Sequence, residues 1–428
     1  MHTANFPWLR RALVGAVLCV DAASALGAVY DVDTTTDSAA LSACTGHAND
    51  CSLRGAIIRA NRNVDWDTVN IPGGTYVLTV AGQYEDAATT GDLDITDSGG
   101  LILTRAPHDP VVIDANHIDR VFEVLAGASV DMSGLAIQGG SASFGSGIQN
   151  RGTLSLTNCT LSGNGHSASI YGGGIRNDAT VTLTNTTLAG NTALFGGGIS
   201  NEGILSQLTA TNCTLSGNSA GDGGGISNSG GRVLLTNCTL SGNSAAVGGG
   251  LFSDVYTTLG NTLIANSVDG GNCQGPVTSL GHNLSDDSSC GLAAAGDLEN
   301  VPAHLAPVLG NNGGPTQTHA LCLWPGVPHS QCTGRSPALD AGDNSNCPAT
   351  DQRYVDRPQD GDGALGPVCD IGAFEVPTAP CPDLSGDGKT DIVDALFISQ
   401  YTVGLRPLSC WMPTAPALMT PITPTAAE

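Results

Sequence analysis

Apolar residues alternate with Thr and Ser over short runs in the middle of the chain, as at Leu154 and Leu156. A two-residue period over such short runs predicts β-strands, and no window in this region sustains a helical period. The runs belong to a unit of about 25 residues, L-T-N-C-T-L-S-G-N, a variable stretch and G-G-G-I-S-N, that recurs over 150–266. Its first asparagine returns in steps of 27, 27, 25 and 24 residues, at Asn158, Asn185, Asn212, Asn237 and Asn261. Three short strands and three turns per unit make one coil of a solenoid, so the sequence predicts a parallel β-helix.

Equivalent residues of the unit should lie above one another, because neighbouring coils are one strand spacing, about 4.8 Å, apart. The repeated asparagines are expected to form amide ladders, in which each side chain bonds to the coil above. Some of these asparagines also stand in Asn-x-Thr glycosylation sequons, but an internal ladder is the better explanation for them. The glycine triplets fit turns that need positive φ and close packing. The position after the first asparagine should form an inward ladder of small, unreactive side chains: Cys159, Thr186, Cys213 and Cys238.

The composition agrees with strands and turns. The chain has 428 residues, of which 58 are glycine, and charged residues make up only 13%. Thirty-nine acidic residues against 15 basic ones give a net charge of −24. Such a chain repels nucleic acid, whose phosphates are bound by Lys and Arg, and it repels bare polyuronates unless a divalent cation bridges the two. We therefore expect no nucleic-acid partner.

The N-terminus and the cysteines indicate export. Arg10 and Arg11 precede an apolar run over Ala12–Val20 and small residues to Ala28, which is the pattern of a signal peptide. The run is too short to span a bilayer and no later segment is apolar enough, so we expect a secreted or cell-surface monomer without a transmembrane segment. Close spacing in an oxidising compartment favours disulfides. The expected pairs are Cys44–Cys51, Cys273–Cys290, Cys322–Cys332, Cys347–Cys369 and Cys381–Cys410.

The repeat, over Val69–Gly270, resembles the pectin-lyase-like right-handed parallel β-helix family, particularly secreted proteins with GGxI and N-x-T repeats. Residues 51–61 (CSLRGAIIRAN) look like the CSLREA motif that precedes β-helices in exported bacterial proteins, with Gly55 in place of the usual glutamate. Ser52 is a good N-cap and the segment has one apolar stripe, so we expect a helix that caps the open end of the stack. Arg54 and Arg59 are expected on the surface of this cap.

Segments beyond the repeat are similar to the C-terminal region of choice-of-anchor proteins. They are SPALDAGD at 336–343, TDQR at 350–353, RPQ at 357–359 and CDIGAFE at 369–375. This resemblance implies export and a surface setting, and it implies no particular reaction.

The strongest chemical motif lies near the C-terminus. Residues Asp383–Asp394 (DLSGDGKTDIVD) fit a twelve-residue calcium loop, with Gly388 at the sharp turn. Aspartate at the twelfth position and the following apolar segment resemble a type I dockerin, which implies a cohesin-like partner, although dockerins carry two such loops and this chain has one. The cofactor we expect is Ca²⁺. Its ligands would be Asp383, Ser385, Asp387, Lys389 through its carbonyl, Asp391 and Asp394.

Catalysis on this fold needs concentrated charge. Polysaccharide lyases need a calcium-holding carboxylate cluster beside an Arg or Lys base, and glycoside hydrolases need two or three converging carboxylates. The charges of the repeat look scattered over different coil phases: Arg151, Arg176, Asp178, Glu202, Asp222, Arg232 and Asp254. The segment 281–283 (GHN) matches only part of a hydrolase motif. Concentrated candidates lie earlier, with polar turn residues as the simpler interpretation: Asp92, Asp94, Asp97, Asp114, Asp119, Arg120 and Asp131. Of these, Asp114, Asp119 and Arg120 are candidates for one coil rim.

Two functions remain open. The first is a non-catalytic exported module that presents an extended face to a glycan or a protein partner. The second is a polysaccharide lyase or O-glycosyl hydrolase. Three carboxylates within about 6 Å in a groove, or an arginine beside such a cluster, favour catalysis, whereas a flat, uncharged face argues against it.

The expected organisation has six parts. They are a signal peptide (1–28), an N-terminal segment with the capping helix (29–68), the β-helix (69–270), its disulfide-rich C-terminal region (271–377), a small α-helical calcium module (378–411) and a disordered tail (412–428).

Overall fold

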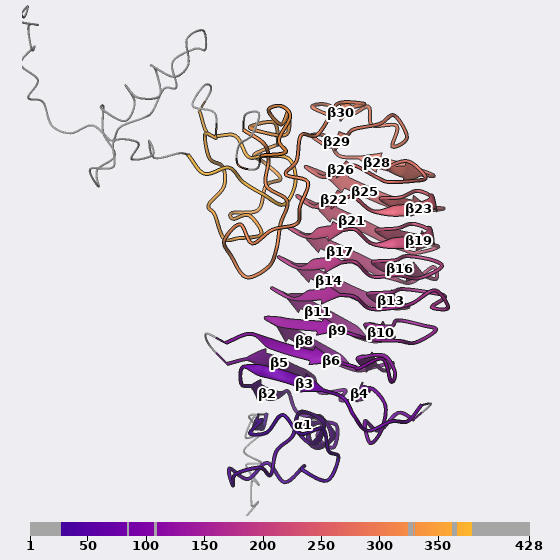
Figure 1. Ribbon diagram of the computed structural model, residues 1–428, viewed down its shortest axis with the longest axis vertical. Helices are drawn as coiled ribbons and strands as arrows, with labels where there is room; N and C mark the ends of the chain where they lie inside the picture. Colours follow the sequence, from indigo (N-terminus) through magenta and orange to yellow (C-terminus); the bar gives the residue numbers. More distant parts are fainter. Residues whose placement is uncertain are drawn as a thin grey trace, which may run out of the picture.

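The computed structural model describes residues 27–83, 85–106, 109–323, 328, 330–361 and 366–378. Within them the chain forms a parallel β-solenoid with one helix, α1 (Leu53–Ala60), at its N-terminal end (Figure 1). Three sheets run along the stack, and eight coils contribute a strand to each. The all-β class and the parallel β-helix are confirmed. The signal peptide, the Cys381–Cys410 pair, the calcium module and the tail lie outside the described residues.

Successive strands of a coil enter the three sheets in turn. The first sheet is formed by β1 (Val29–Asp31), β2 (Asp67–Ile71), β5 (Leu101–Arg105), β8 (Ser129–Ser133), β11 (Thr153–Thr157), β14 (Thr180–Thr184), β17 (Gln207–Thr211), β21 (Arg232–Thr236), β25 (Tyr256–Gly260) and β28 (Val277–Ser279). The second is formed by β3 (Gly74–Val77), β6 (Val111–Asp114), β9 (Leu135–Gln138), β12 (Thr160–Ser162), β15 (Thr187–Ala189), β18 (Thr214–Ser216), β22 (Thr239–Ser241), β26 (Leu263–Ala265), β29 (Leu284–Ser285) and β30 (Leu298–Glu299). The third is formed by β4 (Leu93–Ile95), β7 (Phe122–Val124), β10 (Ile148–Asn150), β13 (Ile175–Asn177), β16 (Ile199–Glu202), β20 (Ile226–Ser229), β24 (Leu251–Ser253) and β27 (Cys273–Gln274). A short pair, β19 (Ser219–Asp222) and β23 (Ser244–Val247), lies outside these sheets.

The core follows the alternation read from the sequence. In β11, Leu154 and Leu156 are fully buried, and the residues between them face outward. The parallel register places Leu154 between Val130 of β8 and Val181 of β14. Like side chains therefore stack on like side chains through the interior, which explains why the repeat is so regular.

Two asparagine columns form the predicted amide ladders. In one column each Nδ2 donates to the Oδ1 of the next coil at 3.0 Å, from Asn164 through Asn191 and Asn218 to Asn243. The other column runs through Asn150, Asn177, Asn201 and Asn228, with distances of 2.7–2.8 Å. Both columns are buried, so each amide satisfies its neighbour where water cannot.

The first asparagine of the unit forms such a bond at one step, where Asn261 Nδ2 donates to Asn237 Oδ1 at 3.3 Å, and the prediction is wrong for Asn158 and Asn212. Its backbone is left-handed, with φ of 57° at Asn158 and 52° at Asn212, a conformation that Asn tolerates better than other non-glycine residues. Its side chain binds the C-terminal region instead. Asn158 Nδ2 donates to Tyr354 Oη at 2.6 Å, and Asn212 Nδ2 donates to the carbonyl of Thr350 at 2.8 Å.

The cysteine predictions are confirmed. Cys159, Cys213 and Cys238 are buried free thiols, and burial raises the pKa of Cys159 to about 11. Four of the expected disulfides are present, and they suggest an extracellular protein. In the described part of the chain, no helix combines the length and the apolar character needed to cross a membrane.

Helix α1 covers the open end of the stack, but Arg54 does not lie on the surface of this cap. Ser52 is the N-cap, and its Oγ accepts the N–H of Gly55 at 2.9 Å. Arg54 is 1% exposed, whereas Arg59 is exposed. A Cβ at Gly55 would lie 1.9 Å from the carbonyl oxygen of Leu41, so the helix packs too closely here for the glutamate of the CSLREA motif.

The stack continues past the predicted boundary at Gly270 to β30, and the chain then returns beside the coils (Figure 1). The segments 336–343, 350–353, 357–359 and 369–375 meet in this return. Arg357 Nε lies 3.1 Å from Glu375 Oε2, and both side chains are fully buried. Gln352 Oε1 accepts the hydroxyl of Thr214 on β18 at 2.7 Å. These segments therefore brace the solenoid.

Candidate functional site

A column of side chains points outward from the third sheet. In each of its strands the first and third residues point into the coil, so the residue between them faces out. The parallel register aligns these residues over eight coils. They are Asp94, Glu123, Gln149, Arg176, Ser200, Ser227, Phe252 and Gln274. The first four, from Asp94 to Arg176, have a charged or amide side chain. The strongly polar part of the column therefore lies at the end of the stack that α1 covers.

A second column of charged residues lies at the ends of the strands of this sheet. Arg151, Asp178 and Asp254 directly follow their strands, and Glu202 is the last residue of β16. The two columns interact. Arg151 Nη1 lies 2.9 Å from Glu123 Oε1, and Arg176 Nη2 lies 3.0 Å from Asp178 Oδ1. The prediction that the repeat charges are scattered is therefore wrong for most of them. The exceptions are Asp222, in β19, and Arg232, in the first sheet.

An aromatic ladder lies on the other side of the outward column. Phe144, Tyr171 and Phe195 precede the glycine segments of three successive coils and pair in register. Their rings stack with centroids 6.0 and 5.1 Å apart. The guanidinium of Arg176 lies 4.8 Å from the ring centroid of Phe144 and 5.2 Å from that of Tyr171. The outward column thus lies between the aromatic ladder on one side and the second charged column on the other, and we call this strip of the third sheet the groove. Within the column Arg176 and Phe252 are half-buried, whereas Asp94, Glu123, Gln149, Ser200 and Ser227 are buried.

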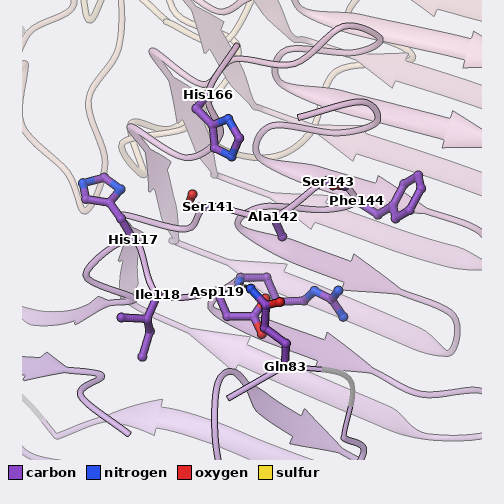
Figure 2. A pocket seen from close by; sticks show the side chains of 10 residues that line it. Gln83, His117, Ile118, Asp119, Ser141, Ala142, Ser143, Phe144 and His166 are labelled. Carbon is purple, nitrogen blue, oxygen red and sulfur yellow. Dashed lines mark hydrogen bonds between the residues drawn. The ribbon is translucent and has the colours of Figure 1, made fainter. Parts of the chain in front are cut away.

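A pocket of about 360 Å³ continues this groove toward α1. Figure 2 shows Phe144 on one side of the pocket and His117 on the opposite side, with His166 above them and Asp119 beside Gln83 below. Hydroxyl, imidazole and carboxylate groups therefore surround a cavity with one aromatic end. Arg120 also lines it.

A second cavity, of about 240 Å³, shares Asp119 and Arg120 with the first. It is lined by the carboxylates of Glu85, Asp86, Asp92 and Glu123 and by Arg151. Arg120 Nη1 donates to Glu123 Oε2 and lies 3.5 Å from Asp92 Oδ2. One oxygen each from Asp86, Asp94 and Glu123 lie within 4.8 Å of one another. The groove therefore ends in an acidic cluster with arginines beside it.

The CSLREA-like segment positions this cluster. Asp37 accepts the N–H groups of Thr79 and Val80 at 2.6 and 2.9 Å, where the loop 79–92 begins. Arg54 pairs with Asp37 and donates to three carbonyls where the loop ends, those of Ala88, Gly91 and Asp92. The buried Asp37–Arg54 pair therefore holds both ends of the loop that carries Asp86 and Asp92.

Asn61, the last residue of the segment, holds β4 in the same way. Its Nδ2 donates to the carbonyl of Asp94 at 2.8 Å, and its Oδ1 accepts the N–H of Thr96 at 2.9 Å. The cap and the acidic cluster are thus one structural unit.

Burial changes the titration of the cluster. It raises the pKa of Asp92 to about 7, with Arg120 opposing and Asp119 reinforcing the rise. It raises the pKa of Asp94 to about 8, reinforced by the neighbouring charge of Asp92. Burial also raises the pKa of Asp119. The raised pKa values of Asp92 and Asp94 show that their ionised forms are unfavourable in this cluster unless a positive charge compensates them.

Four of the candidates named from the sequence meet here: Asp92, Asp94, Asp119 and Arg120. The other three do not. Asp97 caps a turn at the N–H of Gly99, Asp114 accepts the amide of Gln138, and Asp131 is exposed on β8. Of the proposed rim residues, Asp119 and Arg120 line both cavities, whereas Asp114 lines neither of them. His282 of the partial hydrolase motif binds the carbonyl of Ala341 and is structural. The predicted calcium ligands at 383–394 lie outside the described residues.

Sequence reasoning missed the participation of Glu123, Asp86 and Arg151 in the cluster. Aligning the repeats on the isoleucine of G-G-G-I-x-N would have placed Gln149, Arg176 and their followers in common columns. Asp86 carries no such signal, because it lies in a loop outside the repeat.

No family model matches the chain, and no curated protein or solved structure matches it either. The functional argument therefore rests on the groove itself.

Proposed function

We propose that this is an exported protein that binds an extended glycan in the groove on the third sheet. The observation that carries the proposal is the aromatic ladder of Phe144, Tyr171 and Phe195 with the half-buried guanidinium of Arg176 against it. Sugar rings combine apolar C–H faces with hydroxyl groups, so they need an aromatic wall and planar hydrogen-bonding groups together. Because the coils repeat regularly, the groove presents similar contacts to successive units of a polymer.

A binding screen against polysaccharides tests this proposal. Tyr171→Ala should weaken binding of the best glycan at least tenfold, because it opens the middle of the ladder. Tyr256→Ala is the matched control, since Tyr256 is 73% exposed on the first sheet, away from the groove. Equal effects of the two substitutions, or no glycan bound by the wild type, would contradict the proposal.

A second candidate function is cleavage of the bound glycan, by elimination or hydrolysis, at the acidic end. It is favoured by the three carboxylates within 4.8 Å and by Arg120 beside them. The groove is neither flat nor uncharged there, which meets the condition stated above for catalysis. Incubation with the same polysaccharides, scored for unsaturated products and for new reducing ends, separates this function from binding alone. An Arg120→Gln variant with unchanged product release would exclude elimination with Arg120 as the base.

The ends of the chain carry further proposals, supported by their sequence motifs. We propose a right-handed solenoid of the pectin-lyase-like type, export through residues 1–28, and a monomer that does not bind nucleic acid. Residues 383–394 are proposed to bind Ca²⁺ in a dockerin-like module with a cohesin-like partner. Asp383→Ala should then remove one calcium ion per chain in a calorimetric titration, and unchanged stoichiometry would refute this module.

A further inference from the structure

Three carboxylates from separate elements converge at the acidic end of the groove. Asp86 comes from the loop 79–92, and Asp94 and Glu123 are register partners on β4 and β7. One oxygen from each lies within 4.8 Å of the other two. Oxygens bound to one calcium ion lie at most about 4.8 Å apart, since Ca–O distances are about 2.4 Å, so all three oxygens can contact the same ion.

Of these three residues, Asp94 gives the strongest reason to expect a bound cation. Its side chain is fully buried. Its Oδ2 accepts the N–H of Ala88 at 2.8 Å, but its Oδ1 forms no hydrogen bond within the described part of the chain. A buried carboxylate oxygen without a partner is costly, and coordination to a cation removes that cost.

The charge balance around Asp94 is also incomplete. Among the described residues that line this cavity, only Arg120 and Arg151 carry positive charge against the carboxylates, which are Glu85, Asp86, Asp92, Asp119 and Glu123, with Asp94 beside them. Glu85 is satisfied by the N–H groups of its own loop. Glu123 binds both arginines, yet each carboxylate oxygen has two lone pairs and can also bind an ion.

We propose that Asp86, Asp94 and Glu123 bind a calcium ion that fastens the loop 79–92 to the first two coils. Asp94 and Glu123 supply oxygens from neighbouring strands, and Asp86 supplies one from the loop. The ion compensates negative charge that the two arginines leave unbalanced. This site is separate from the loop at 383–394, and it does not depend on glycan binding.

Calorimetric titration of the full chain with CaCl₂, in the absence of glycan, tests the proposal. The Asp383→Ala variant provides the background, because it removes the other proposed site. In that background one calcium ion per chain should still bind. Asp94→Asn and, separately, Asp86→Asn should each weaken this binding at least tenfold. Asp131→Asn, which changes an exposed carboxylate on β8, should leave it unchanged.

Asp86 is exposed, so Asp86→Asn tests the ligand without disturbing the core, and circular dichroism in a chelator checks that each variant folds. Absence of calcium binding to the Asp383→Ala variant would overturn the proposal. Unchanged affinity in both the Asp94 and the Asp86 variants would overturn it too. Either result leaves glycan binding untouched, because that screen is run in a chelator as well as with calcium.

Discussion

Replacing Arg54 with methionine should destabilise the capped end of the solenoid by about 3–5 kcal/mol, the usual cost of breaking a buried ion pair from one side. All five N–H donors of Arg54 are used. Nε and Nη2 bind the carboxylate of Asp37 at 2.5 and 3.3 Å. The other three bonds reach the carbonyls of Ala88, Asp92 and Gly91 at 3.0, 2.9 and 2.8 Å. Methionine keeps the packing of the aliphatic stem and removes every one of these bonds.

The expected loss of stability can be estimated from the groups that lose their hydrogen-bond partners. Three backbone carbonyls lose their donor, and each unsatisfied buried group costs about 1–3 kcal/mol. The loop lies beside a cavity, so its freed carbonyls can move toward water. We therefore expect a loss of stability in the lower half of the range that the three costs add up to. Asp37 keeps its bonds from the N–H groups of Thr79 and Val80, but its charge stays buried without a counterion.

Urea unfolding followed by circular dichroism measures the loss, and hydrogen exchange locates it. Exchange should accelerate first in the loop 79–92 and in α1, because coils of a solenoid are stabilised mainly by their neighbours. Arg59→Met is the matched control, since Arg59 is exposed in the same helix. Adding Asp37→Asn to Arg54→Met should recover part of the loss. The reasoning fails if Arg54→Met and Arg59→Met differ by less than about 0.5 kcal/mol.

Three further predictions concern the cap and the core. Gly55→Ala improves helix propensity but should destabilise by about 1–3 kcal/mol in urea unfolding, because its Cβ meets the Leu41 carbonyl; a stabilised variant would contradict this packing. Burial alone would raise the pKa of Asp37, but hydrogen bonds from Arg54 and from the start of the loop hold it below its usual value. The resulting stability is complete above about pH 4 and is lost as pH falls through the lowered pKa, so Asp37→Asn should flatten the acid side of the stability profile. The Cys159 thiol should resist alkylation at about pH 8 in the native protein and react once urea unfolds it, because its pKa is about 11; labelling without unfolding would show that the column is open.

Features that depend on the repeat could be predicted from the sequence. The alternation of apolar and polar residues predicts the strands and the burial of Leu154 and Leu156. The stacking of equivalent residues in successive coils predicts the thiol column. The disulfides were found because each joins cysteines only 7–22 residues apart. In all of these cases the relevant neighbour is either close in sequence or one repeat away, so the pattern itself specifies the contact.

Features that depend on segments outside the repeat could not be predicted. Arg54 was expected on the surface because helical periodicity describes only the helix, and the loop 79–92 that covers it has no periodic signal. The acidic cluster joins Asp86 from that loop to Glu123, which is 37 positions further along the chain. Asn158 was assigned to a ladder because repetition alone does not distinguish an inward amide from a left-handed turn residue that binds a later segment.

The position of the acidic cluster within the stack is itself an argument for function. Stacking alone favours identical coils with small side chains, and in the middle coils the outward column carries serine, at Ser200 and Ser227. At the capped end the same column carries Asp94 and Glu123, which are 0% and 4% exposed. Burying a carboxylate costs more free energy than burying a serine at the same position. Asp94 and Glu123 therefore do not stabilise the stack. Charged groups kept at such a cost, at the end of a groove with an aromatic wall, are best explained by a bound ligand or ion. If so, Asp94→Asn should raise the unfolding midpoint measured in a chelator and lower the one measured in calcium, and a fall in both conditions would show that Asp94 is structural.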